Sequence, residues 1–128
     1  MLLYDKEALA AAAGRTPAAI TGMEPGSDNT RVTFTDGSAL VLRHQPDCCE
    51  SVTIEDVAGD PADLIGHPLA LCSEETGEPG PEPEYVDSLT WSFYKFGGLG
   101  GYVTLRWLGE SNGYYSETVH VEFEQGAQ

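Results

Sequence analysis

Short segments of alternating apolar and polar residues, separated by turn sequences, constrain this chain more than any other feature. Val32 and Phe34 alternate with polar neighbours just before Asp36-Gly37, a dipeptide typical of a hairpin turn. Further turns are indicated by the glycines of 97–101 and by Asn112-Gly113. A period of two places alternate side chains on opposite faces of a strand. The sequence therefore predicts antiparallel strands joined largely by short turns.

The period-two segments predict a mainly β protein of the α+β class. About six to eight strands form a curled antiparallel sheet, either a small barrel or a sandwich. The last three strands, joined by turns at 97–101 and 109–113, predict an antiparallel meander. The expected strands cover about 18–23, 31–35, 38–44, 51–57, 68–72, 89–94, 102–107 and 114–124.

Two helical segments are expected in addition to the strands. The alanine-rich stretch from Asp5 to Ala13 predicts a short helix that ends at Gly14. Asp60 followed by Pro61 is the pattern of a helix N-terminus and predicts one short helical turn.

The 128 residues are expected to form one domain. Within it we predict an N-terminal helical region over 1–16, a core over 30–124 and a mobile acidic loop over 73–87. There is no window of about 18 apolar residues and no basic leader before an apolar segment. We therefore expect no membrane span and a cytoplasmic location, where an odd number of cysteines stays reduced.

The charge balance is strongly acidic and limits the partners that the chain can bind. Asp plus Glu number 21 and Lys plus Arg number 6, which gives a net charge of −15. So few cations argue against direct nucleic-acid binding, because that affinity comes from neutralising phosphates. Residues 44–94 contain no Lys or Arg. A field of this sign attracts a basic protein surface.

The densest group of chemically versatile residues lies between the predicted strands at 38–44 and 51–57. It comprises His44, Asp47, Cys48, Cys49 and Glu50. With His67 and Cys72 these residues supply zinc-type donors, but neighbouring cysteines lack the usual ligand spacing. We expect mainly packed thiols and no cofactor, and leave open whether a metal is bound.

A second polar group surrounds the predicted turn at 109–113 and is a candidate recognition surface. Its members are Asn112, Tyr114, Tyr115 and Glu117, residue types that recur in binding surfaces. Arg106 is the only Lys or Arg after residue 95, so we expect its charge to pair with Glu117 or Glu50. The two polar groups are predicted to form one site.

Two blocks of the sequence resemble a family of short, uncharacterised phage and bacterial proteins, a domain of unknown function. The first block runs from His44 through Asp47-Cys-Cys-Glu50 and Asp63-Leu-Ile-Gly66 to Pro68. The second contains Thr90-Trp-Ser-Phe-Tyr-Lys95, Val103-Thr-Leu-Arg-Trp107 and Ser111-Asn-Gly-Tyr-Tyr-Ser-Glu117. The resemblance covers about 30–123 and implies a single domain. It implies no activity, cofactor or catalytic residue.

The sequence favours a binding module without catalysis that recognises a basic protein surface. The resemblance to phage proteins implies that a nucleic-acid-binding protein of the host could present this surface. One alternative is a metal-dependent or Cys/His hydrolase that uses His44, Cys48 or Cys49, and Glu50, with Glu55 and Asp56 nearby. Another is a small-molecule-sequestering protein with a cleft lined by Tyr, Trp and Arg. The oligomeric state stays open.

Overall fold

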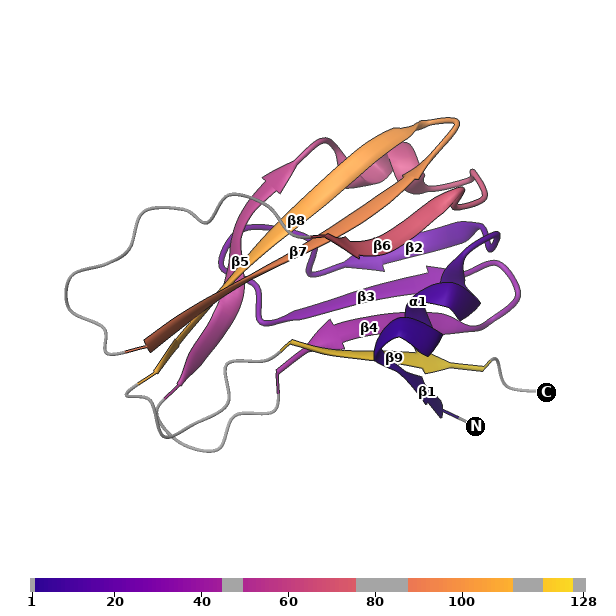
Figure 1. Cartoon of the computed structure of the whole chain (residues 1–128). Helices are drawn as coiled ribbons and strands as arrows, with labels where there is room; N and C mark the ends of the chain where they lie inside the picture. Colours follow the sequence, from indigo (N-terminus) through magenta and orange to yellow (C-terminus); the bar gives the residue numbers. More distant parts are fainter. Residues whose placement is uncertain (1, 45–49, 76–87, 112–118, 126–128) are drawn as a thin grey trace.

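The computed structural model describes residues 2–44, 50–75, 88–111 and 119–125. Within them, nine strands form two antiparallel sheets packed against each other, with one α-helix and one 3-10 helix (Figure 1). The mainly β prediction is therefore confirmed. Of the two architectures considered, the structure has the sandwich and no closed barrel.

The first sheet, sheet A, has the strand order β1-β9-β4-β3-β2, and the second, sheet B, has the order β5-β8-β7-β6. The strands of sheet A are β1 (Leu2–Tyr4), β2 (Pro17–Thr21), β3 (Asn29–Phe34), β4 (Ala39–Arg43) and β9 (His120–Glu124). Those of sheet B are β5 (Ser51–Ala58), β6 (Leu71–Glu75), β7 (Ser88–Gly98) and β8 (Gly101–Ser111). The helices are α1 (Asp5–Ala12) and η1 (Pro61–Leu64).

The core lies between the sheets and receives alternate side chains from both. Phe34 and Phe123 from sheet A place their rings 6.4 Å apart, and Trp107 from sheet B is fully buried. Each large apolar side chain buried in this way contributes about 1.5–3 kcal/mol. Further fully buried core residues are Val32, Leu40, Leu42, Ile54, Leu69, Phe96, Val103, Leu105 and Val121.

The two faces of β7 are both rich in aromatic residues, and the structure shows which face is inside. Tyr94 and Phe96 lie opposite Leu105 and Val103 of β8 and are buried with them. Trp91 therefore lies on the outer face of sheet B and is only half-buried. Alternation reports that a strand has two faces, whereas the packing partner decides which face is inside.

The predicted meander of the last three strands is wrong. β7 and β8 do form a hairpin, but β9 leaves sheet B and lies between β1 and β4 in sheet A. The reason is geometric. The second edge of β8 is already hydrogen-bonded to β5 from Ser51 to Ala58, so no edge remains there for β9.

Several predicted boundaries also need correction. The expected loop over 73–87 begins too early, because Ser73, Glu74 and Glu75 pair with β7; residues 76–87 lie outside the described part. The expected turn over 109–113 likewise starts too early, since β8 continues to Ser111. The sequence reading missed β1, whose 3 residues are too few to show a period.

The two helices lie where the sequence predicts them. α1 contacts β9, β1, β6 and β4, buries Ala8, Leu9 and Ala12, and is followed by Gly14 with a φ of 85°. η1 begins after Asp60, whose carboxylate accepts a 3.0 Å hydrogen bond from the backbone N–H of Ala62.

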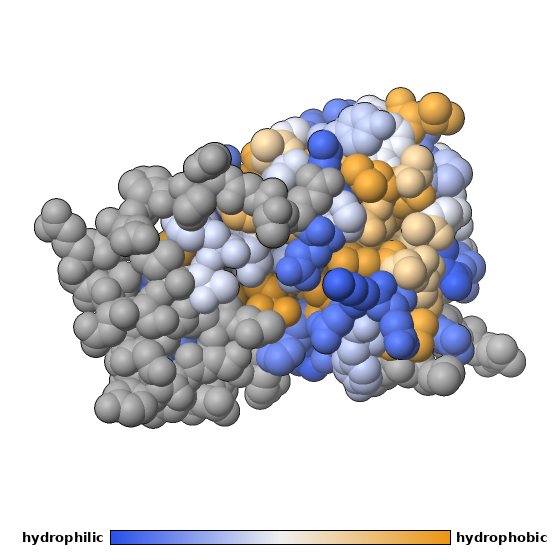
Figure 2. Space-filling view, viewed as in Figure 1, coloured by the Kyte–Doolittle hydropathy of each residue, from blue (hydrophilic) through white to orange (hydrophobic). Residues whose placement is uncertain are grey.

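The face of the molecule on which α1 lies is mixed in character. Figure 2 shows hydrophilic side chains gathered beside apolar ones over the helix, and an apolar tip where β7 turns into β8. Leu99 at that turn is 94% exposed, and Tyr102 beside it is 59% exposed.

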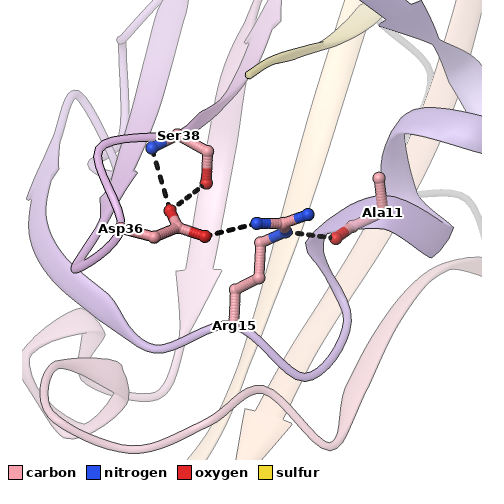
Figure 3. Close-up of polar contacts among 4 residues, drawn as sticks. All are labelled: Ala11, Arg15, Asp36 and Ser38. Atoms are coloured by element: carbon pink, nitrogen blue, oxygen red, sulfur yellow. Dashed lines mark hydrogen bonds and ion pairs between the residues drawn. The ribbon is translucent and has the colours of Figure 1, made fainter. Parts of the chain in front are cut away.

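Arg15 contacts both the end of α1 and the hairpin between β3 and β4 (Figure 3). Its Nε donates a 2.7 Å hydrogen bond to the carbonyl of Ala11, and its guanidinium forms an ion pair with Asp36. The guanidinium also lies 4.7 Å from the ring centre of Phe123. Asp36 accepts hydrogen bonds from the hydroxyl and backbone N–H of Ser38. One side chain thus joins the helix, the hairpin turn and the core.

Candidate functional site

A buried histidine–glutamate pair lies at one end of the sandwich. His44 directly follows β4 and Glu50 directly precedes β5. Their side chains are 4% and 0% exposed, and His44 Nε2 lies 3.7 Å from Glu50 Oε2. Charged groups are costly to bury unless they interact with one another or with hydrogen-bonding partners. The structure therefore brings together His44 and Glu50, the first and last residues of the first predicted polar group.

A second histidine extends this pair. His120 at the start of β9 stacks on His44, with ring centres 5.9 Å apart and planes inclined by 19°. The register of sheet A brings the two residues close together, because His44 directly follows Arg43, which lies opposite His120. The two histidines thus connect the end of β4 to the start of β9. Glu50 connects them to the start of β5 in sheet B.

A hollow of about 170 Å³ opens beside the pair. Carbon atoms form more of its exposed wall than polar atoms do, although five of the six described lining residues are polar or charged. Asp28 lies just before β3 and is exposed, whereas Glu50 is buried. The described residues that line the hollow are Asp28, His44, Glu50, Ser51, Val52 and Thr53.

Most of the sequence-predicted site residues lie outside the described part of the chain. They are Asp47, Cys48, Cys49, Asn112, Tyr114, Tyr115 and Glu117. The described residues that flank them do meet at one end of the sandwich. Ser51 pairs with Glu110, and Arg43 pairs with His120. The prediction that both polar groups form one site stays a prediction.

Arg106 does not make the contact expected for it with Glu50. The register places Arg106 opposite Asp56, whereas Ser51 lies opposite Glu110. At about 3.3 Å per residue, Arg106 and Glu50 are separated by roughly 16 Å along the sheet. The guanidinium instead lies 5.3 Å from the ring centre of Trp91, on the outer face of sheet B. Among the described residues, its buried Nε has no hydrogen-bond partner.

The described residues do not gather the donors of the alternative metal or thiol chemistry. His67 lies close to Gly100 at the β7–β8 turn, whereas Cys72 lies on β6 beside α1. Burial raises the pKa of the Cys72 thiol to about 12, which disfavours the thiolate needed for nucleophilic attack. Within the described part of the chain, no group of three or more His, Cys, Asp and Glu side chains is placed to hold a metal ion.

An edge of the molecule next to the hollow is lined by exposed carboxylates, which we call the acidic edge. The turn before β3 is joined to β5 because Gly26 donates to the carbonyl of Ile54 and Ile54 donates to that of Ser27. This pairing brings the acids on both sides of the turn next to those of β5. Asp60 and Asp63 continue the edge beyond the end of β5, and Asp63 lies beside the β7–β8 turn. The acidic edge consists of Glu24, Asp28, Glu55, Asp56, Asp60 and Asp63, all exposed.

Three of the arginines lie elsewhere and are already paired with carboxylates. Arg31 Nη2 lies 2.8 Å from Glu124 Oε2, and Arg43 Nη2 lies 3.2 Å from Glu122 Oε1, on the outer face of sheet A. Arg15 pairs with Asp36. These ion pairs cancel positive charge away from the acidic edge.

Sequence reasoning missed part of this site. Asp28, Ser51 and Thr53 line the hollow but belong to a turn and a strand that gave no functional signal on their own. His120 belongs to neither of the two polar groups that the sequence predicts. The one available signal was the strand periodicity of 51–57, which places Thr53 on the face opposite to Val52 and Ile54.

The fold and these side chains define a small acidic β-sandwich with polar groups concentrated at one end and one edge. The chain belongs to the DUF7448 family, a domain of unknown function, which matches residues 11–121. No curated protein and no solved structure matches it. No helix in the described part of the chain is both long and apolar enough to cross a membrane.

Proposed function

We propose that the protein is a non-catalytic binding module that recognises a basic protein surface through the acidic edge. The supporting observation is the excess of exposed carboxylates along this edge, where one arginine, Arg106, lies opposite Asp56. Arg15, Arg31 and Arg43 are held in ion pairs away from this edge, while its six carboxylates are exposed. Oriented surface charge of this kind speeds association with a partner of opposite sign and excludes partners of the same sign.

The chemistry of the edge also favours a protein partner over a nucleic acid. Exposed carboxylates repel a phosphate backbone, and the net charge of −15 adds to this repulsion. A nucleic-acid-binding protein presents a basic surface, and its cations complement the acidic edge. We therefore propose such a protein as the partner, in agreement with the resemblance to short phage and bacterial proteins.

The test is capture of partners from host lysate by two matched variants. Glu55→Gln/Asp56→Asn removes two charges from the acidic edge, and Glu7→Gln/Glu74→Gln removes two exposed charges elsewhere. We expect the wild type and the control to retain a partner at about 0.05 M salt and to lose it at about 0.5 M, where charges are screened. The edge variant should capture less at low salt.

Two results would contradict the proposal. One is the absence of any salt-sensitive partner. The other is equal capture by the edge variant and the control, which would mean that total charge, and not the acidic edge, governs binding.

A further inference from the structure

We propose that the hollow beside His44 and Glu50 is the pocket that receives one cationic side chain, a guanidinium or an ammonium, from the basic partner. The inference rests on the proposed function, because it names the specific contact within that binding surface. The volume of about 170 Å³ is far larger than the roughly 10–15 Å³ needed by a single water.

The position of the hollow places it on the binding surface. Asp28 belongs both to the acidic edge and to the lining of the hollow. Ser51 is exposed at the start of β5, the strand that carries Glu55 and Asp56. A partner docked along the acidic edge would therefore lie next to the hollow.

The chemistry of the lining selects a cationic donor. The Asp28 carboxylate accepts hydrogen bonds, and the hydroxyls of Ser51 and Thr53 offer further acceptors. The fully buried Glu50 carboxylate lies beneath the wall and does not contact a guest. No Lys or Arg lines the described part of the hollow. Arginine and lysine side chains carry several donors and a positive charge, and hydrogen bonds between oppositely charged groups are about twice as strong as neutral ones.

The depth of the two carboxylates gives them different parts in binding. Asp28 is exposed at the rim and attracts the incoming cation, but water screens its interaction. The Glu50 side chain is fully buried and does not touch a guest, but a charge there is screened less than one at the surface. Asp28 is therefore expected to make the direct contact, and Glu50 to add attraction at a distance. A bare metal ion fits less well, since the described residues provide no group of three ligands.

The experiment uses three small probes and nuclear magnetic resonance. The uniformly labelled protein is titrated with N-acetyl-arginine amide, N-acetyl-lysine amide and the neutral isostere N-acetyl-citrulline amide. We expect saturable shifts of the backbone amides of Ser51, Val52 and Thr53 with the two cationic probes, and none with citrulline.

Variants then separate the two carboxylates. Asp28→Asn should weaken binding about two- to fivefold, as for an exposed ion pair. Glu50→Gln should weaken it by a similar factor, because the charge beneath the hollow is lost without a direct contact. The control Glu7→Gln, on α1, should bind like the wild type. If Glu50→Gln does not fold, Asp28→Asn and the map of shifted amides still decide the question.

Three results would overturn the pocket: equal binding of citrulline, shifts located away from 51–53, or unchanged affinity in both folded variants. The probes need no partner protein, so the two proposals fail separately. Probe binding without salt-sensitive capture supports the pocket and contradicts the proposed function. Salt-sensitive capture without probe binding supports the proposed function and contradicts the pocket.

Discussion

Glu50 and His44 place a carboxylate oxygen and an imidazole nitrogen 3.7 Å apart inside the sandwich, although five residues separate them along the chain. The pair joins the end of β4 in sheet A to the start of β5 in sheet B. It therefore contributes to the relative position of the two sheets as well as to the candidate site.

Glu50→Gln should destabilise the fold. The glutamine keeps the shape of the side chain but loses the charge that interacts with His44. We expect the free energy of unfolding to fall by about 1–3 kcal/mol, the usual cost of disturbing a buried polar interaction. Urea denaturation measures this difference. The exposed control Glu55→Gln should change stability by less than about 0.5 kcal/mol.

A double-mutant cycle with His44→Asn tests the same pair more directly. Residues in contact show coupling free energies of about 0.5–3 kcal/mol. Additive effects of Glu50→Gln and His44→Asn would show that the two side chains do not interact.

Asp36 should make stability depend on pH in the acid range. Hydrogen bonds from the hydroxyl and backbone N–H of Ser38, with the nearby Arg15, hold the pKa of Asp36 below its usual value of 3.8. A carboxylate whose pKa is lower in the folded state stabilises the fold above the unfolded pKa. That stabilisation is lost as the pH falls through the folded pKa.

The measurement compares the wild type with Asp36→Asn by urea denaturation at several pH values. The stability difference should be constant above about pH 5 and should shrink below about pH 4. A difference that stays constant down to pH 3 would rule out a lowered pKa at Asp36.

Arg106→Ala should have a modest effect on stability. In the described part of the chain Arg106 contacts the ring of Trp91 and forms no ion pair. Losing a cation–π contact costs about 0.5–1 kcal/mol at a partly exposed site. Thermal unfolding and Trp fluorescence would measure the change. A loss of about 3–5 kcal/mol would instead reveal a buried ion pair.

Gly59→Ala should be far more harmful than Gly66→Ala. Both glycines have a positive φ, 99° and 87°, which costs an alanine about 1–2 kcal/mol. A Cβ at Gly59 would in addition lie 2.2 Å from the carbonyl oxygen of Tyr102, whereas one at Gly66 would meet nothing within 4 Å. Equal melting temperatures for the two variants would show that the backbone at Gly59 can move away from Tyr102 with no loss of stability.

Cys72 should react slowly with thiol reagents. With a pKa of about 12, only about one thiol in ten thousand is ionised at pH 8, and the thiolate is the nucleophile. The rate of alkylation by iodoacetamide, measured in a Cys48→Ser/Cys49→Ser variant, should be well below that of a free cysteine. Rapid labelling in the folded protein would contradict the burial of this thiol.

The sequence by itself determined the local elements. The alternation of 31–35 and 51–57 predicted β3 and β5, and the spacing of Asp60 and Pro61 predicted η1. These predictions succeed because side-chain direction along a strand and the capping of a helix depend on neighbours a few residues away.

Only the tertiary structure decided which strands pair and which polar groups meet. The pattern of β9 is the same whether it joins β8 or β4, and its position followed from which edges were already occupied. The register also separated Arg106 from Glu50 and brought His44 beside it. Hydrogen bonding and burial between distant segments set these relationships, and period-two alternation carries no information about the partner strand.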